Sequence, residues 1–341
     1  MSKTHNEIMD TPNALRKTID YLHRQWPSIS GFLNGRKRFA FLGCGSSYSL
    51  ARSASIMFQM RTGLPSAVLP AGDLLLHAPR YERILSGAAV ICISRSGQTS
   101  EMLMALDSIK HFGIAALAMI CVEGTPLEER CELSLNMPWA FDDSVCQTRT
   151  VTNFYFTYTY IMAKYLGDQT LLDDLRHIAD CSGDFLQVAE KLSGEIAARP
   201  WNHCVVVADA ELEGIADEGA LAFKEICQLP SNYYHILDAR HGPMVLIGEQ
   251  TLLLAAVDGD ALELGFLSEM KDKGALAVAF SDMPLDAPGI ISLPYGRKLT
   301  HIARGIPFIM MCQMISLRKA AYTGADPDRP SGLDAWISLE S

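Results

Sequence analysis

The sequence contains one order of apolar segments twice, and this repetition constrains the fold more than any other feature of the chain. In the first half, apolar runs predict strands at Arg38–Gly43, Ser66–Pro70, Ala88–Ile93, Ala115–Cys121 and Leu133–Met137, with helical segments between most of them. The second half repeats this order with Cys204–Asp209, Thr251–Val257, Ala275–Phe280 and Ile290–Leu293. Each half then closes with a long apolar helix, Val151–Tyr165 or Ile302–Tyr322. Alternating strands and helices predict parallel sheets with right-handed crossovers, and the repetition predicts a tandem duplication of one α/β unit.

Length and composition agree with two globular cores. A chain of 341 residues with 49% hydrophobic and 20% charged residues suits two α/β units of ordinary composition. A net charge of −10 argues against nucleic acid or an anionic membrane as a partner. The nine cysteines show no C-x-x-C spacing and are expected to be reduced thiols. Because the chain starts without an apolar signal core and has no membrane-length apolar run, we expect a cytoplasmic protein.

The same pattern predicts how the chain divides. Residues 1–34 form an N-terminal helical segment in which Leu15, Ile19 and Leu22 recur at helical spacing, and Thr11-Pro12 suits the start of that helix. We expect a first domain at 35–166, a helical linker at 167–199, a second domain at 200–325, and a tail at 326–341 over the active site.

A hydroxyl-rich turn joins the Ala88–Ile93 strand to a helix that starts near Ser100. Its sequence, Ser94-Arg-Ser-Gly-Gln-Thr99, combines backbone N–H groups at a helix start with three hydroxyls, and Gly97 lets the backbone approach a ligand closely. Such a turn can hold a phosphate, although Ser and Thr also serve simply as helix caps. Cys44–Ala51 is a second strand–turn–helix junction of this kind. The corresponding turn of the second half, Asp258-Gly-Asp260, is acidic, so we expect phosphate binding in the first half alone.

Several motifs together resemble the sugar isomerase (SIS) domain family, most closely the isomerase module of glutamine:fructose-6-phosphate aminotransferase and its stand-alone relatives. The motifs are Cys44-Gly-Ser-Ser-Tyr48, Ser94-Arg-Ser-Gly-Gln-Thr99, Val145-Cys-Gln-Thr-Arg149, Glu218-Gly-Ala-Leu-Ala-Phe-Lys-Glu225, Arg240-His-Gly-Pro243 and Asp326-Pro-Asp-Arg-Pro330. The resemblance spans nearly the whole chain. It implies two tandem flavodoxin-like domains, each a parallel β-sheet flanked by helices in three α/β/α layers, that form a homodimer or a higher oligomer and bind phosphorylated sugars.

The resemblance also implies roles for particular residues. Glu225 matches the base that moves a proton between C1 and C2, and His241 matches a histidine that assists ring opening from the neighbouring subunit. Phosphate contacts fall on Ser47, Ser94, Arg95 (through its backbone), Ser96, Gly97, Gln98 and Thr99, and sugar contacts fall on Gly45, Ser46, Val145 (through its backbone), Cys146 and Gln147.

Elementary chemistry agrees with the two catalytic roles. Proton transfer between adjacent carbons needs a carboxylate, and ring opening needs an acid that titrates near neutral pH. Glu225 lies on a helical segment next to an apolar face, where burial could raise its pKa, although it could also pair with Lys224. His235 could be a second acid, but we expect it to pack behind Tyr233 and Tyr234. No histidine shows metal-ligand spacing, so neither metal nor cofactor is expected.

Two departures from the family narrow the reaction. The aminating isomerase carries one lysine in the helix before its base and another in its tail, and here these positions are Ala222 and Ala335. An amine for a Schiff base is therefore missing at both places, and we expect no glucosamine 6-phosphate synthesis from glutamine. An aldose–ketose isomerase, an isomerising deaminase of an amino sugar 6-phosphate, and a deglycase of a 6-phosphofructosamine remain open. A non-catalytic sugar-phosphate sensor is the alternative of another class.

Overall fold

The computed structural model describes residues 2–336 and 338–339, which fall into two compact units. The first-repeat unit takes the described parts of Asp10–Asp143, Arg149–Ala179 and Asp334–Ser341. The second-repeat unit takes those of Met1–Met9, Ser144–Thr148 and Asp180–Leu333. Two long helices, α1 (Lys3–Leu33) and α7 (Gln169–Ala197), contribute residues to both units.

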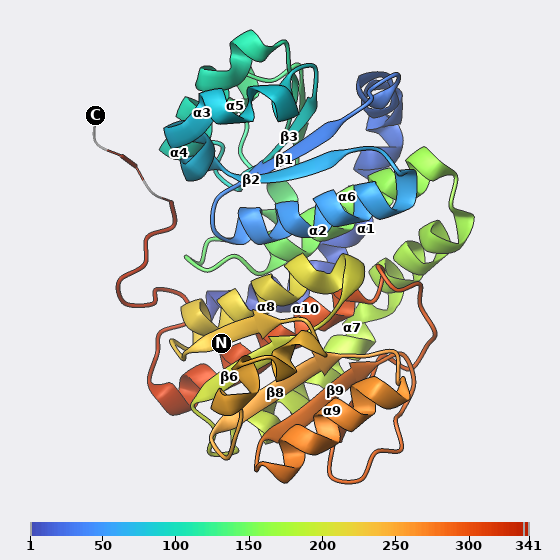
Figure 1. The fold of residues 1–341 in the computed structure, drawn as a ribbon, viewed down its shortest axis with the longest axis vertical. Coiled ribbons are helices and arrows are strands. Elements are labelled where there is room, and N and C mark those ends of the chain that lie inside the picture. Colours follow the sequence, from blue (N-terminus) through green and yellow to red (C-terminus); the bar gives the residue numbers. More distant parts are fainter. Residues whose placement is uncertain (1, 337, 340–341) are drawn as a thin grey trace. The chain divides into compact units, whose positions relative to one another are not determined.

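The first-repeat unit is built on a five-stranded parallel sheet with the order β2-β1-β3-β4-β5 (Figure 1). The strands are β1 (Phe39–Gly43), β2 (Ser66–Pro70), β3 (Ala89–Ile93), β4 (Ala115–Ile120) and β5 (Leu133–Asn136). The helices are α2 (Ser46–Thr62), α3 (Ala71–Leu85), α4 (Ser100–Ile109), α5 (Pro126–Glu129) and α6 (Arg149–Leu166), with short 3-10 turns η1 (Lys110–Phe112) and η2 (Pro138–Ala140).

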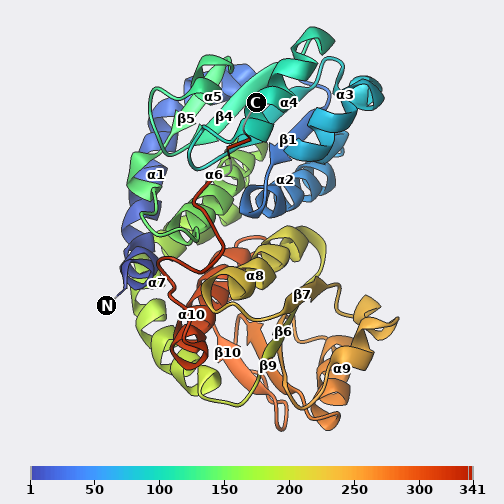
Figure 2. The same cartoon turned by 90° about the vertical axis from the view of Figure 1, so that its left-hand side faces the viewer.

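Alternation along its strands produces three layers. Leu42 and Cys92 point to the face covered by α3 and α4, where they join a continuous core. Phe39 and Phe41 point to the other face, and their rings lie 5.0 and 5.1 Å from that of Phe58 on α2. The helices on both faces are visible in Figures 1 and 2. A strand buried on both faces explains why these segments are continuously apolar.

The second-repeat unit has a five-stranded parallel sheet with the order β10-β9-β8-β6-β7. Its strands are β6 (His203–Val207), β7 (Ser231–Tyr234), β8 (Thr251–Ala256), β9 (Leu276–Ser281) and β10 (Ile291–Pro294). Its helices are α8 (Glu213–Ile226), α9 (Ala261–Asp272) and α10 (Gly305–Thr323), with 3-10 turns η3 (Ala210–Leu212), η4 (Asp238–Arg240) and η5 (Pro243–Leu246). Read from β7, this order equals that of the first sheet. The predicted fold class, two tandem flavodoxin-like domains, is confirmed.

The layers of this unit also follow from alternation. Val205 and Val207 point to the face that carries α9. Val206 points to the opposite face, which α8 covers, and a Cβ added to Gly219 of α8 would lie 2.8 Å from Sγ of Cys312 on α10. Helices α8 and α10 therefore pack closely on that face.

Two local predictions were wrong. The first is the start of the N-terminal helix, because α1 begins at Lys3 and Pro12 lies inside it. The carboxylate of Asp328 accepts hydrogen bonds from the backbone N–H groups of Lys3 and Thr4, both 2.9 Å long, across 325 and 324 residues of sequence. A distant residue therefore caps the helix, and the local signal at Thr11-Pro12 does not decide its start.

The second is the set of strands in the second half, because no strand was predicted between Cys204–Asp209 and Thr251–Val257 and the structure has β7 there. Its sequence Ser231-Asn-Tyr-Tyr234 is too polar to predict a buried strand. It is an edge strand that pairs with β6 alone among the described strands, so it needs no continuous apolar run.

Candidate functional site

The turn Ser94–Thr99 follows β3 in the first-repeat unit and has the structure of an anion-binding loop. Ser94 and Ser96 are buried, and their hydroxyls accept hydrogen bonds from the N–H groups of Gly97 and Gln98, at 3.1 and 3.2 Å. Since a hydroxyl that accepts still has its own proton to donate, both can also donate to an anion. Gly97 has a φ of +64°, which favours glycine, and the buried side chain of Thr125 lies directly against it.

The equivalent turn of the second-repeat unit shows what such a loop binds, because it holds an anion of its own. The carboxylate of Glu263, three residues into α9, accepts hydrogen bonds from the backbone N–H groups of Asp258, Gly259 and Asp260, each 2.9 Å long. Asp260 completes a capping box with Glu263. This nest of N–H groups is therefore filled from within the chain, and the negative charges of Asp258 and Asp260 add to that of Glu263.

The turn Ser94–Thr99 differs from the turn Asp258–Asp260 at the position that corresponds to Glu263. The residue three places into α4 is Met102, which is buried and apolar, and Thr99 makes no side-chain cap to α4 within the described residues. The first turn of α4 does contain a carboxylate, that of Glu101, but among the described residues it accepts no hydrogen bond from the turn Ser94–Thr99. The duplicated unit thus keeps the geometry of an anion loop in both copies, with an internal anion at this place in the second copy alone.

A second turn lies beside the first. Strands β1 and β3 are neighbours in register, with Leu42 opposite Cys92, so the segment Gly45–Ser47 and the turn Ser94–Thr99 leave the same edge of the sheet. A Cβ on Gly43 would lie 2.3 Å from the backbone carbonyl of Ser47, so only glycine lets α2 start this close to the strand. Their meeting place is the point where the strand order reverses, which is where doubly wound sheets bind ligands.

The side chain of Arg95 turns away from the loop that contains it. Its guanidinium is buried and donates a 2.8 Å hydrogen bond to the backbone carbonyl of Ala335 in the tail. It also lies over the ring of Phe141, 5.7 Å from the centroid. Arg95 therefore links Ala335 of the tail to the turn Ser94–Thr99.

Neighbouring thiols are unreactive. Burial raises the pKa of Cys44 to about 11, and the charge of Glu101 adds to this effect. One carboxylate oxygen of Glu101 is itself buried without a hydrogen-bond partner among the described residues. Cys44 is consequently a thiol at neutral pH, and no nucleophilic role for it follows from the structure.

The other predicted sugar contacts, Val145–Gln147, lie in the second-repeat unit. The N–H of Val145 donates to the backbone carbonyl of Asp328 at 3.1 Å, and that of Ser144 donates to the carboxylate of Glu7 at 3.0 Å. The side-chain oxygen of Gln147 is buried and has no hydrogen-bond partner among the described residues. An unpaired buried amide oxygen is costly in a folded protein and marks a place where a ligand donor would be stabilised.

The two predicted catalytic residues lie on opposite faces of one sheet. Glu225 is half-buried near the end of α8, which packs with α10 on the face to which Val206 points. His241 is exposed in the segment after β7, whose buried residues Ile236, Ala239 and Ile247 belong to the core under α9. The sheet therefore separates the elements that carry them within one chain.

His235 packs edge-to-face on Tyr233 as expected, with ring centroids 5.5 Å apart. It also pairs with two acids, since its Nδ1 lies 2.9 Å from a carboxylate oxygen of Asp209 and its Nε2 lies 3.5 Å from one of Glu213. His235 is partly exposed at the carboxyl edge of the sheet. The residues Asp209 and Glu213 were not singled out from the sequence, because their pairing depends on the chain path between β6 and β7.

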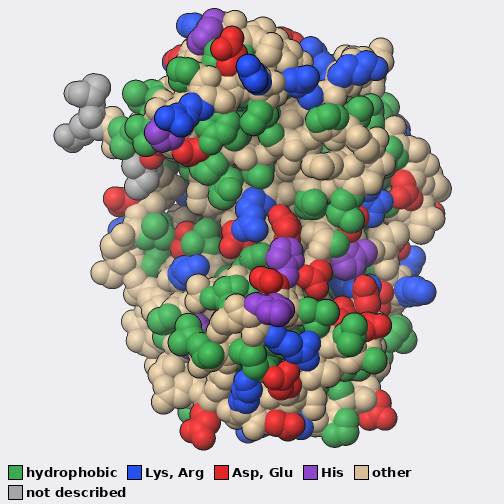
Figure 3. Space-filling model, viewed as in Figure 1, with side chains coloured by type: hydrophobic (Ala, Val, Ile, Leu, Met, Phe, Trp, Pro, Cys, Tyr) green, Lys and Arg blue, Asp and Glu red, His purple; other side chains and the backbone are tan. Residues whose placement is uncertain are grey.

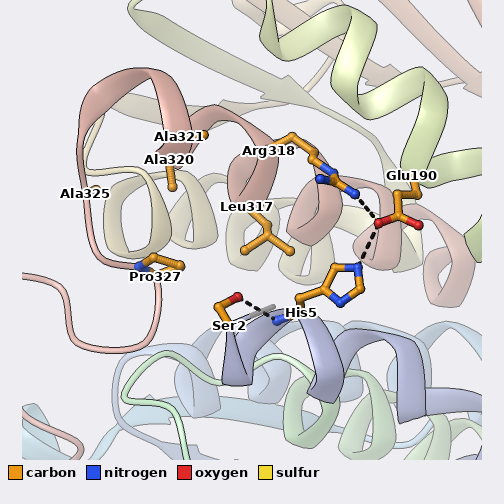
Figure 4. A pocket seen from close by; sticks show the side chains of 9 residues that line it. All are labelled: Ser2, His5, Glu190, Leu317, Arg318, Ala320, Ala321, Ala325 and Pro327. Atoms are coloured by element: carbon orange, nitrogen blue, oxygen red, sulfur yellow. Dashed lines mark hydrogen bonds and ion pairs between the residues drawn. The ribbon is translucent and has the colours of Figure 1, made fainter.

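A cavity of about 470 Å³ lies elsewhere in the second-repeat unit, between α1, α7, α10 and the segment that follows α10 (Figure 4). Its polar wall is formed by His5, Glu190 and Arg318, with the Glu190 carboxylate between the other two, and 2.7 Å from Nε2 of His5. None of the sequence-predicted site residues line it. Over the residues described, no group of three or more His, Cys, Asp and Glu side chains could hold a metal ion, and no helix is long and apolar enough to cross a membrane.

On the face drawn in Figure 3, basic side chains are interspersed with acidic ones among the residues shown. This distribution agrees with the net charge of −10 and offers no extended basic surface on that face.

The duplicated sheet and its switch-point loop define a tandem, doubly wound α/β protein. Residues 32–163 match the family model of the SIS domain. The chain therefore contains a SIS domain, and the resemblance inferred from its motifs is confirmed.

Similarity to known proteins extends over both units. The chain is 24% identical to a glutamine–fructose-6-phosphate aminotransferase (isomerizing) of Photorhabdus laumondii and 25% identical to one of Methanothermobacter thermautotrophicus, with 98% of this chain covered in each case. It spans 58% and 57% of the length of these relatives.

Solved structures share the fold. A glucosamine-6-phosphate deaminase from Thermotoga maritima superposes with a TM-score of 0.85 at 23% identity, covering 99% of this chain and 100% of that one. A tagatose-6-phosphate ketose/aldose isomerase from Escherichia coli superposes with a TM-score of 0.86 at 20% identity, covering 100% of this chain and 96% of that one.

Proposed function

We propose that this protein is an enzyme that binds a sugar or amino sugar 6-phosphate and moves a proton between its C1 and C2. The observation that carries the proposal is the contrast between the two anion loops. Glu263 fills the loop of the second-repeat unit, whereas the loop Ser94–Thr99 offers hydroxyls and N–H groups to which no carboxylate of the described residues is hydrogen-bonded. The relatives are named for fructose 6-phosphate, glucosamine 6-phosphate and tagatose 6-phosphate, and these names support a sugar phosphate as the anion.

The proton transfer needs one base and one acid. Glu225 would remove the proton from one carbon and return it to the neighbouring carbon through an enediol, while His241 would protonate the ring oxygen as the sugar opens. With an amino sugar, the same transfer produces an imine at C2, and water then releases ammonia and leaves the ketose. Both outcomes conserve the redox state of the substrate as a whole, so neither requires a redox cofactor.

A deglycase is a second candidate reaction, which Ala222 and Ala335 favour. Ala222 is buried in α8, and the carbonyl of Ala335 is held by Arg95, so neither position offers an amine for a Schiff base with a ketose. In a 6-phosphofructosamine, Glu225 would move a proton between C1 and C2 through an enaminol to give an imine at C1, and water would hydrolyse this imine to the aldose phosphate and the free amine without any lysine amine.

We further propose that the active unit is a homodimer with shared sites. Glu225 and His241 lie on elements packed against opposite faces of one sheet, so a second copy of the chain would bring its His241 to the substrate held by the first. Exposed apolar residues surround this histidine in sequence, with Val245 82% and Leu246 64% exposed. An apolar surface of this kind is typical of a protein interface.

One assay separates the reactions. Purified protein is incubated with hexosamine 6-phosphates and 6-phosphofructosamines while free ammonia, free amino acid and uptake of solvent deuterium are measured. Ammonia indicates a deaminase, amino acid indicates a deglycase, and exchange alone indicates an isomerase. Binding without any of the three would contradict an enzyme and favour a sugar-phosphate sensor.

Two further experiments test the phosphate loop and the sharing of sites between two chains. The double variant Ser96→Ala, Thr99→Ala should weaken phosphorylated ligands and leave unphosphorylated sugars unaffected, and an equal loss for both would contradict the phosphate assignment. Mixing inactive Glu225→Gln and His241→Ala chains should restore activity if sites are shared. Failure of the mixture to recover, although mixed dimers form, would show that each chain acts alone.

A further inference from the structure

Asp328, in the tail motif Asp326–Pro330, makes contacts with two distant parts of the second-repeat unit. Its carboxylate accepts hydrogen bonds from the backbone N–H groups of Lys3 and Thr4, at 2.9 Å each, and from the hydroxyl of Thr4 at 2.8 Å. The same hydroxyl lies 2.9 Å from the carbonyl of Pro327. A carboxylate at a helix N-terminus is stabilised by these N–H groups and by the helix dipole, so the tail and the start of α1 are held together.

The backbone of Asp328 holds the third element, the segment 144–148. Its carbonyl accepts a 3.1 Å hydrogen bond from the N–H of Val145. One turn further along α1, the buried carboxylate of Glu7 accepts from the N–H of Ser144 at 3.0 Å and from its hydroxyl. Thus α1 and the tail hold residues 144 and 145 from two sides, and all of these contacts lie within one unit.

We propose that Asp328 and Glu7 are positioning residues that fix the backbone of Val145–Gln147 for contact with the sugar. The inference rests on the proposed function, which assigns the sugar contacts to this segment. It gives a role to Glu7, which no sequence motif contains, and to Asp328, which lies in the motif Asp326–Pro330 but had no role assigned to it, because both act through the backbone of another segment.

The lowered pKa of Asp328 agrees with hydrogen bonds that depend on its negative charge. Burial alone would raise the pKa of this carboxyl, but the hydrogen bonds from Thr4 and Lys3 outweigh burial and lower it. The group is therefore ionised at neutral pH. The variant Asp328→Asn keeps the size of the side chain and removes its charge, while Asp328→Ala removes both acceptors.

Two matched controls separate positioning from stability. Asp260→Ala removes another N-terminal cap in the same unit, that of α9, without touching α1 or residues 144–148. Asp326→Asn removes a carboxylate two residues from Asp328, where it accepts the N–H groups of Asp328 and Arg329 in a local turn that asparagine can also form. Neither control belongs to the proposed site.

The first test uses the ligand-free protein. Hydrogen exchange is measured for peptides that cover residues 144–148, and Asp328→Asn and Asp328→Ala should accelerate exchange there relative to Asp260→Ala at matched thermal stability. Exchange equal to that of wild type in both Asp328 variants would show that Asp328 does not hold residues 144–148 in place. This readout does not depend on any activity, and Asp328→Asn serves if the alanine variant does not fold.

The second test compares two probes. Glucosamine 6-phosphate carries the sugar that the segment Val145–Gln147 is proposed to contact, whereas inorganic phosphate has no sugar. Asp328→Asn and Glu7→Gln should weaken the sugar phosphate by up to about tenfold, the factor expected for one displaced hydrogen bond, and leave inorganic phosphate within about twofold. Equal weakening of both probes would indicate a general loss of structure and would overturn the positioning role. If the wild-type protein binds neither probe, the proposed function fails, while the exchange test still decides whether Asp328 holds residues 144–148 in place.

Discussion

Replacing Gly97 by alanine tests the phosphate loop at its tightest point. The residue has a φ of +64°, and a Cβ built there would lie 2.4 Å from Oγ1 and 2.7 Å from Cβ of Thr125. Thr125 cannot easily yield, since it is buried and caps α5 by accepting the N–H of Glu128. The loop must therefore move or strain.

The magnitude follows from two contributions. A left-handed alanine costs about 1 kcal/mol relative to glycine, and the contact with Thr125 adds about 1–3 kcal/mol by overpacking. Gly113 provides the matched control, because its φ is +67° and a Cβ there would meet no atom of the described structure within 4 Å. Gly113→Ala should therefore cost about 1 kcal/mol and Gly97→Ala about 2–4 kcal/mol.

Urea denaturation of the two variants measures the difference, and titration with a phosphorylated sugar measures the consequence for binding. We expect Gly97→Ala to weaken binding of the phosphorylated ligand at least about tenfold, because relief of the 2.4 Å contact must displace the loop and misalign several donors at once, and Gly113→Ala to leave the affinity unchanged. Equal destabilisation by the two variants would refute the packing argument. Unchanged ligand affinity in Gly97→Ala would refute the role of the loop.

Three further predictions follow from the charged groups. Glu263→Ala should lower the free energy of unfolding by about 1 kcal/mol, because three partly exposed N–H groups lose their acceptor to water; unchanged stability would contradict the anion nest. For His301, burial is the largest single effect and lowers the pKa, but Asp258, the backbone carbonyl of Asp209 and the charge of Glu211 together raise it more, so the net shift is upward. The stabilisation should be full below about pH 6.5 and lost as the pH rises through the raised pKa, so the advantage of wild type over His301→Gln in thermal denaturation should shrink as the pH rises above about 6.5. An equal difference in thermal stability between wild type and His301→Gln at all pH values would contradict the interaction between His301 and Asp258. Arg95→Gln should expose the backbone near Ala335 to faster hydrogen exchange, with Arg95→Lys intermediate, whereas unchanged exchange would show that the guanidinium does not hold the tail.

Local signals in the sequence were sufficient for most of the fold. The strands of the first-repeat unit are found within one or two residues of their predicted ends, because a buried parallel strand needs a continuous apolar run that is visible in the sequence. The turn Ser94–Thr99 also follows from local chemistry, since its hydroxyls, its glycine and the helix after it are adjacent in the chain. The polar edge strand β7 escaped prediction because pairing with one neighbour does not require such a run.

The site depends on contacts that no local pattern contains. The start of α1 is set by Asp328, which lies 325 residues from Lys3 in the sequence. The filled loop of the second-repeat unit is itself local, because Glu263 accepts hydrogen bonds from N–H groups three to five residues before it. The separation of Glu225 from His241, in contrast, requires knowing which face of the sheet each element covers. Short-range sterics and burial determine most elements separately, so the sequence by itself determined most of the elements, their order and the candidate residues. Only the tertiary structure decided which of these residues meet, because long-range caps and shared faces form between segments whose distance along the chain carries no information about their distance in space.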